Sequence, residues 1–273
     1  MKGTCSVRYR AKGIMDTYAM PHAHDNEFEI FQPLDNSGSV IIKNKIYPMK
    51  KGALYFIDGI NSHCPSPSDA GSYRRNIIII SRSYCAKLFE MLNISSAAEK
   101  LFSEDGGSCC PLSEKDAETA NGIFERMSKI SCESDAFSEV KLVYGMAALM
   151  ELGLRNKNTR LTETNDIVSK ILNYTEENLG EGITLDKICT EFHISKYYLC
   201  HLFKKQTGLT VTEYIHMRRI AVAKTLLCST EKTVGEVAAE CGFNSQAYFG
   251  KLFSLSEGVT PGEFRRKNKL FFD

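Results

Sequence analysis

The residues with the clearest chemical potential near the N-terminus are histidines and carboxylates. His22, His24 and Glu29 lie within one short stretch, and His63 follows in a later segment. Imidazole and carboxylate groups can ligate zinc, iron or manganese, and they can also hydrogen-bond a polar small molecule. The pattern therefore leaves three interpretations open: an effector pocket, structural polarity at a barrel mouth, or a metal site. We expect the effector pocket, without a metal or another cofactor.

A second group of candidate residues lies in an internal repeat near the C-terminus. Residues 184–214 align with residues 233–264, with one extra residue, Asn244, in the second copy. The identical pairs include Ser195/Ser245 and Phe203/Phe253. A duplication of this length indicates two copies of one supersecondary unit.

Each copy of the repeat has the pattern of a helix, a tight turn and a second helix. The first helix has hydrophobic residues at i, i+3, i+4 and i+7. The turn is followed by Ser195 or Ser245, whose hydroxyl can accept a free backbone N–H at the start of a helix. The repeat therefore predicts two helix-turn-helix units. The residues of the hydrophobic pattern are Leu185, Ile188, Cys189 and Phe192, and then Val234, Val237, Ala238 and Cys241.

The second helix of each unit is expected to leave small and polar residues outside. Leu199, Leu202 and Phe203 would face the core in the first unit, as Phe249, Leu252 and Phe253 would in the second. Small and polar side chains on an exposed helix suit the major groove of DNA, where base edges must be approached closely. The outward faces comprise Lys196, Tyr197, Cys200, His201 and Lys204, and then Gln246, Ala247, Gly250, Lys251 and Ser254.

Positive charge is concentrated in the same region. The whole chain has a net charge of only +1, so contacts with DNA must depend on local clusters. Residues 196–224 contain six cations against Glu213 alone. Clustered cations neutralise phosphates and supply affinity that is independent of sequence. The first cluster consists of Lys196, Lys204, Lys205, Arg218, Arg219 and Lys224, and a second basic run consists of Arg265, Arg266, Lys267 and Lys269.

One helix over about residues 211–228 should join the two units, with Thr210 and Glu213 as a capping box at its start. A rigid connector fixes the distance between the reading helices. Entry into successive major grooves on one face of DNA requires a separation of about 34 Å, and a shorter one requires the DNA to bend.

At these residues the sequence resembles the AraC/XylS family of bacterial transcription regulators. The resemblance covers roughly residues 165–269 and rests on SKYYLCHLFKKQTG, RRIAVAKTLL, VGEVAAECGFNSQAYFGKLF and TPGEFRR. It implies that the two second helices read adjacent major grooves. The residues it implies as base contacts are Tyr197, Cys200, His201, Gln246, Ala247, Gly250 and Lys251. Those expected at the DNA backbone are Ser195, Lys196, Lys204, Arg218, Ser245 and Arg265.

The N-terminal region resembles the cupin-like sensor barrel of the same family, in PHAHDNEFEI, KKGALYFIDGINSHCP and YRRNIIIISRSY. Short strands over residues 1–83 and helices over 113–130 and 136–154 predict an α+β chain. The expected divisions are a sensor barrel over 1–100, a helical dimerisation or linker region over 101–160 and a DNA-binding domain over 161–273. The segment 136–154 is apolar nearly all round, which fits either a dimer helix or burial against its own barrel.

We therefore expect a cytoplasmic, ligand-responsive DNA-binding regulator rather than an enzyme. Activation is the commoner outcome in the proteins it resembles. The expected partners are double-stranded DNA, a small effector such as a sugar, a second copy of the chain and, for an activator, RNA polymerase. No apolar run has the roughly 18 residues needed to span a membrane. The alternatives are a cupin-type metalloenzyme with a helical appendage and a helical adaptor that does not bind DNA.

Overall fold

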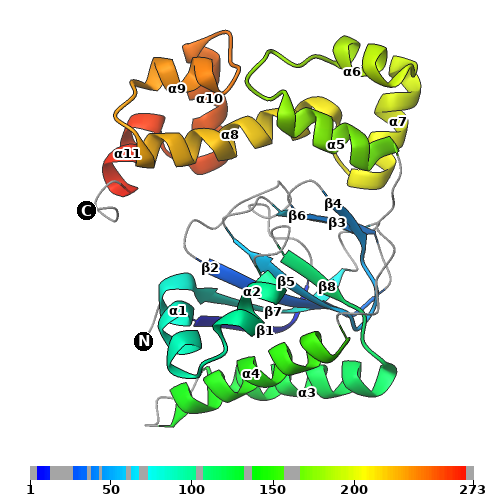
Figure 1. Ribbon diagram of the computed structural model, residues 1–273, viewed down its shortest axis with the longest axis vertical. Coiled ribbons are helices and arrows are strands. Elements are labelled where there is room, and N and C mark those ends of the chain that lie inside the picture. Colours follow the sequence, from blue (N-terminus) through cyan, green and yellow to red (C-terminus); the bar gives the residue numbers. More distant parts are fainter. Residues whose placement is uncertain are drawn as a thin grey trace. The chain divides into compact units, whose positions relative to one another are not determined.

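The computed structural model describes residues 5–12, 27–35, 38–42, 45–59, 63–67, 73–102, 107–131, 137–156 and 167–268 (Figure 1). The chain divides into two compact units, Met1–Thr164 and Asn165–Asp273. Each unit is described separately below.

The N-terminal unit contains two antiparallel sheets. The larger has the order β1 (Cys5–Lys12), β7 (Arg74–Ser81), β2 (Glu27–Pro33), β5 (Leu54–Asp58) and β8 (Gly107–Cys110). The smaller has the order β4 (Lys45–Pro48), β3 (Ser39–Ile42) and β6 (His63–Ser66). The short strands expected over residues 1–83 correspond to β1–β7, whereas β8 lies within residues 101–160, which were expected to be helical.

Strands β7, β2 and β5 of the larger sheet are buried on both faces, which explains the unbroken Ile77–Ile80 run in β7. Successive side chains of a strand point to opposite faces. Phe31, Ile77 and Ile79 accordingly join Val40 and Ile42 of the smaller sheet in one core. The residues between them, such as Ile30 and Ile78, join a second core that includes the helices.

Four helices pack on the second face: α1 (Arg82–Met91), α2 (Ser95–Phe102), α3 (Glu114–Ile130) and α4 (Ser138–Asn156). Ser113 caps α3, because its Oγ accepts the backbone N–H of Asp116 at 3.2 Å. The predicted helices over 113–130 and 136–154 are therefore present. On α4, Met146 and Leu149 are buried against the unit's own core. Val140 and Tyr144 of the same helix are exposed by 62% and 76%.

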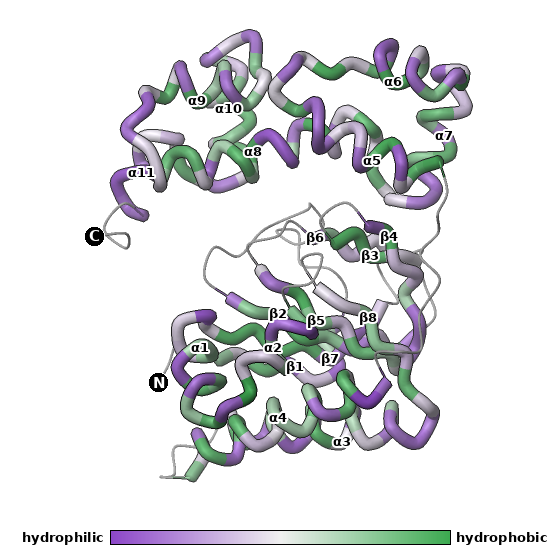
Figure 2. Tube along the Cα trace, in the orientation of Figure 1, coloured by the Kyte–Doolittle hydropathy of each residue, from purple (hydrophilic) through white to green (hydrophobic). Residues whose placement is uncertain are grey.

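The C-terminal unit is helical throughout its described residues. A long helix, α8 (Val211–Ser229), has α5 (Ile167–Glu177), α6 (Leu185–Phe192) and α7 (Lys196–Thr207) at one end. The helices α9 (Val234–Glu240), α10 (Gln246–Glu257) and α11 (Pro261–Asn268) lie at its other end (Figure 1). Hydrophobic and hydrophilic residues alternate along these helices, and α11 is largely hydrophilic (Figure 2). In the described ranges, no helix is long and apolar enough to cross a lipid bilayer.

Candidate nucleic-acid interface

The first helix-turn-helix unit is formed by α6 and α7, and its turn is set by local hydrogen bonds. The Thr184 hydroxyl accepts the backbone N–H of Lys187 at 3.3 Å and caps α6. His193 ends α6 in the left-handed conformation, with φ of 50°. The Ser195 hydroxyl then accepts the backbone N–H of Tyr198 at 3.2 Å and caps α7. The predicted cap at Ser195 is thus confirmed.

The two faces of α7 differ as the sequence pattern predicted. Leu199 and Phe203 are buried in the unit. Tyr197 is 82% exposed, and its ring stacks on His201 with centroids 6.3 Å apart. Cys200 is half-buried. A shallow surface hollow follows this outward face, and it is lined by Tyr197, Cys200, His201, Lys204 and Lys205.

The second unit repeats this arrangement in α9 and α10. Thr233 and Glu236 form a complete capping box at the start of α9. The Ser245 hydroxyl accepts the backbone N–H of Tyr248 at 3.3 Å and caps α10. Phe249 and Phe253 are buried. On the outward side, Gln246, Ala247 and Lys251 are exposed, and a Cβ added to Gly250 would meet no atom within 4 Å.

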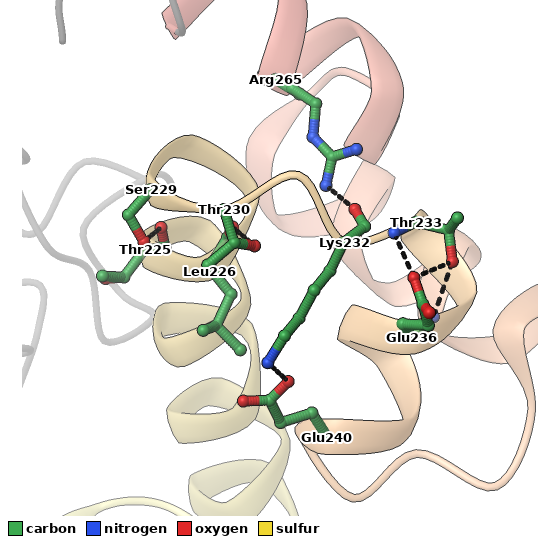
Figure 3. Close-up of polar contacts among 9 residues, drawn as sticks. All are labelled: Thr225, Leu226, Ser229, Thr230, Lys232, Thr233, Glu236, Glu240 and Arg265. Atoms are coloured by element: carbon green, nitrogen blue, oxygen red, sulfur yellow. Dashed lines mark hydrogen bonds and ion pairs between the residues drawn. The ribbon is translucent and has the colours of Figure 1, made fainter.

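Figure 3 shows how the start of α9 is joined to α8 and α11. The Arg265 guanidinium donates to the Leu227 carbonyl at 3.0 Å and to the Lys232 carbonyl. The Lys232 ammonium pairs with Glu240 at the end of α9. Arg265 was expected at the DNA backbone, but its guanidinium hydrogen-bonds carbonyls left free where α8 ends. Arg265 therefore has a structural role, and its contact with the DNA backbone stays a prediction.

Arg218, which was also expected to contact the DNA backbone, is paired within the protein. Its guanidinium donates to both oxygens of Glu176, from Nε at 2.6 Å and from a terminal nitrogen at 2.8 Å. The Tyr214 hydroxyl donates to the same carboxylate at 2.9 Å. A bidentate pair of this kind commits the guanidinium to its partner. Arg218 therefore fixes α8 to α5 and is not available to a phosphate in this arrangement.

The charge that can reach DNA is consequently smaller than the sequence suggested. Lys224 is buried and pairs with Glu257 at 3.0 Å. Arg219 is also buried. Lys196 is exposed but lies 3.1 Å from Asp186. The exposed cations that remain on or near the recognition helices are Lys196, Lys204, Lys205, Lys251, Arg266 and Lys267.

Within the C-terminal unit, a contact that the sequence did not indicate joins the helices at one end of α8 to those at its other end. Arg219 of α8 donates from Nε to the Leu179 carbonyl, at 3.1 Å, in the segment that follows α5. Its guanidinium also lies over the ring of Phe243, 5.7 Å from the centroid. Gly242 adopts φ of +81°, and a Cβ there would lie 2.4 Å from the same Leu179 carbonyl.

His216 extends this contact on the next turn of α8. Its ring lies 5.6 Å from that of Tyr248 in an edge-to-face arrangement and 6.3 Å from that of Phe243. The connector is therefore braced by tertiary contacts near its middle. We infer that the separation of α7 and α10 is set by these contacts as well as by the helix itself. Gly242 aligns with His193 of the first copy, and both residues have a left-handed backbone. A glycine at the turn of the second copy is the one signal in the sequence that could have indicated this contact.

The residues predicted as an effector pocket fall in the N-terminal unit. Glu29 and His63 are brought together, with Oε2 and Nε2 3.2 Å apart, and both are buried. His22 and His24 lie outside the described residues. No group of three or more potential metal ligands occurs within the described segments.

Comparison with known proteins identifies the class of protein. A family model described as a helix-turn-helix domain matches residues 188–267. The HTH-type transcriptional activator RhaR of Yersinia pseudotuberculosis is 23% identical over 255 residues, which cover 89% of this chain and 84% of RhaR. The chain is a member of the AraC/XylS family of transcription regulators. As such it binds double-stranded DNA and is not an enzyme.

Two solved structures resemble this AraC/XylS-family chain to different extents. The C-terminal domain of the response regulator yesN from Fusobacterium nucleatum is 32% identical, covering 35% of this chain and 94% of that domain, with a TM-score of 0.34. ToxT from Vibrio cholerae is 17% identical, covering 96% of this chain and 98% of ToxT, with a TM-score of 0.40. The first likeness is confined to about a third of the chain, and the second extends over nearly all of it.

Proposed function

We propose that this regulator activates transcription in the cytoplasm by reading DNA with α7 and α10. Support comes from the two capped recognition helices, which keep polar outward faces while their opposite faces are buried. In this proposal Tyr197, Cys200 and His201 approach base edges from α7. Gln246, Ala247, Gly250 and Lys251 do so from α10, and the backbone contacts are Ser195, Lys196, Lys204 and Ser245.

Specific binding to DNA tests this assignment of faces. Sites would be selected from random duplex DNA with the full chain, and affinities would then be measured at fixed salt. His201→Ala and Lys251→Ala should each weaken binding to the selected site by about 1–3 kcal/mol if these residues read bases. Lys170→Ala removes an exposed cation from α5, outside both units, and should leave affinity unchanged. Variants at His201 and Lys251 that bind like wild type would refute the proposed faces.

The N-terminal unit is proposed to bind a small polar effector, such as a sugar, between its two sheets. The buried Glu29–His63 pair supports this, because it places a carboxylate and an imidazole, which can both hydrogen-bond a polar ligand, in the interior of this unit. An effector regulates only if it binds one arrangement of the protein more tightly than another. The cupin-like resemblance of this unit is retained as a prediction.

We further propose that α4 contributes to a homodimer. Val140 and Tyr144 are four residues apart, so they lie on one face of the helix, and both are largely exposed. An activator of this kind would also contact RNA polymerase. Sedimentation of the Tyr144→Glu variant should show a smaller species than wild type if this face joins two copies. The Lys141→Glu variant, a change beside the proposed interface, is the matched control.

A further inference from the structure

The interior of the N-terminal unit contains a buried arginine side chain. Arg75 is only 6% exposed and lies near the start of β7, paired with Pro33 of β2 and Ala11 of β1. Its Nε makes no hydrogen bond, and no carboxylate of the described chain forms an ion pair with it. A buried charge without a partner is costly, so such a group is seldom retained without a use.

The side chain of Arg75 is directed into the core between the two sheets. Residues 75, 77 and 79 share one face of β7 because side chains alternate along a strand. Ile77 and Ile79 belong to the core that the smaller sheet covers, as does Tyr73. The Arg75 guanidinium lies over the Tyr73 ring, 5.5 Å from its centroid. Arg75 therefore faces the same interior as the proposed effector pocket.

Two further polar atoms near Arg75 also make no hydrogen bond among the described residues. One is the hydroxyl of Tyr73, a residue that is fully buried, and the other is Oδ1 of Asp35. Burial raises the pKa of Tyr73 to about 12, the neighbouring Arg75 guanidinium acts to lower it, and the Glu29 and Asp35 carboxylates make smaller contributions that raise it. Tyr73 thus keeps its proton at neutral pH and can donate it to an acceptor. The Arg75 Nε, the Tyr73 hydroxyl and one Asp35 carboxylate oxygen are therefore buried without a hydrogen bond among the described residues.

We propose that this cluster binds an anionic, hydroxyl-bearing small molecule. Arg75 would pair with its carboxylate or phosphate group, Tyr73 would donate a hydrogen bond to the same group, and Asp35 would accept from a ligand hydroxyl. The inference rests on the proposed effector function of this unit and narrows the effector to an acidic sugar derivative. The ligand supplies a counter-charge for Arg75, with which no described carboxylate pairs.

Thermal unfolding of the full chain tests the anion subsite without knowledge of the natural effector. The probes are sodium phosphate and sodium acetate, each compared with sodium chloride at equal ionic strength. The melting temperature of wild type should rise by about 3–6 °C at ten times the dissociation constant. Arg75→Met should abolish the rise, and Arg75→Lys should keep part of it. Lys87→Ala, which removes an exposed cation from α1 of the same unit, should keep all of it.

The stability without anions separates this inference from a purely structural role. If Arg75 only awaits a ligand, Arg75→Met should melt at the same or a higher temperature than wild type in chloride. A lower melting temperature together with an unchanged response to phosphate would overturn the proposal. An equal fall in the melting temperature of Asp35→Asn in chloride would also overturn the proposal, because Asp35 would then be the counter-ion of Arg75.

A second experiment distinguishes carboxylate from phosphate ligands, and it separates the anion subsite from the proposed effector site. Glucuronate, glucose 6-phosphate and glucose share a ring and differ in charge, and each would be tested for its effect on melting and on DNA affinity. A shift with either acid that Arg75→Met removes supports the inference and tells carboxylate from phosphate. A shift with glucose alone would overturn the inference while leaving the proposed effector site intact. No shift with any sugar or simple anion would overturn both.

Discussion

The contact between Gly242 and the Leu179 carbonyl allows a direct test of how the two DNA-binding units are held. Gly242 has φ of +81°, and a Cβ there would lie 2.4 Å from that carbonyl and 2.9 Å from a terminal nitrogen of Arg219. Gly258, at the end of α10, has nearly the same φ of +70°, but a Cβ there would meet nothing within 4 Å. Alanine at these two positions therefore imposes a similar backbone strain and a very different steric clash.

The expected cost follows from these two environments. A left-handed conformation costs an L-residue about 1–2 kcal/mol, partly offset by about 0.4–1 kcal/mol from a less flexible unfolded chain. Gly258→Ala should therefore destabilise the C-terminal unit by about 1 kcal/mol. Gly242→Ala adds the cost of overpacking against a backbone carbonyl that cannot rotate away, about 1–3 kcal/mol. Its total should be about 2–4 kcal/mol.

Urea denaturation followed by far-UV circular dichroism measures this difference, which suits a chain without tryptophan. Binding to a selected DNA site that spans both units gives a second readout. Gly242→Ala should lose tenfold or more in affinity, because simultaneous engagement of two sites fails when their geometry changes. Gly258→Ala should bind within about twofold of wild type. Equal effects of the two substitutions on stability and on DNA affinity would refute the reasoning that the Leu179 contact sets the geometry.

Two other predictions concern charge. Lys205→Ala should reduce the slope of log K for DNA binding against log salt concentration by about 0.9. Lys224→Ala should leave this slope unchanged, because Lys224 pairs with Glu257. Equal slopes in both variants would contradict the division into exposed and structural cations. Burial lowers the pKa of His216, with the nearby charge of Arg219 as a second cause. A depressed pKa in the folded state means that stability is present above the unfolded value near 6.5 and is lost as pH falls through the folded value. The melting temperature of wild type should therefore fall between pH 7.5 and 5.5, and His216→Asn should flatten this dependence; an unchanged dependence would exclude His216 as its source.

The features that the sequence predicted well are those decided by neighbouring residues. A cap hydroxyl at Ser195 or Ser245 acts on an N–H three residues later, and the inward positions of α7 and α10 follow from helical periodicity. The strands of the N-terminal unit were recognisable for the same reason. By contrast, β8 is a short strand of glycine, serine and cysteine without periodicity, and its identity depends on pairing with β5.

The features that escaped sequence analysis depend on tertiary partners. Nothing local distinguishes Arg218, which pairs with Glu176 42 residues away, from an exposed arginine. The same is true of Arg265, whose acceptor Leu227 is 38 residues away. Counting cations along the chain therefore overstated the charge that DNA can meet. The unpaired state of Arg75 was hidden likewise, because a basic residue in a strand sequence does not reveal which face it occupies or what lies opposite.

This division of charge constrains how affinity for DNA arises. If each of the six exposed cations neutralised one phosphate, the slope of log K against log salt would be about −5. Affinity from charge alone would then fall by roughly a thousandfold between 50 and 200 mM salt. Such an interface binds firmly only when both recognition helices add base contacts at the same time. The braced connector is thus required for specificity. If the spacing of the two helix-turn-helix units were not fixed, each recognition helix would bind alone with half of these cations.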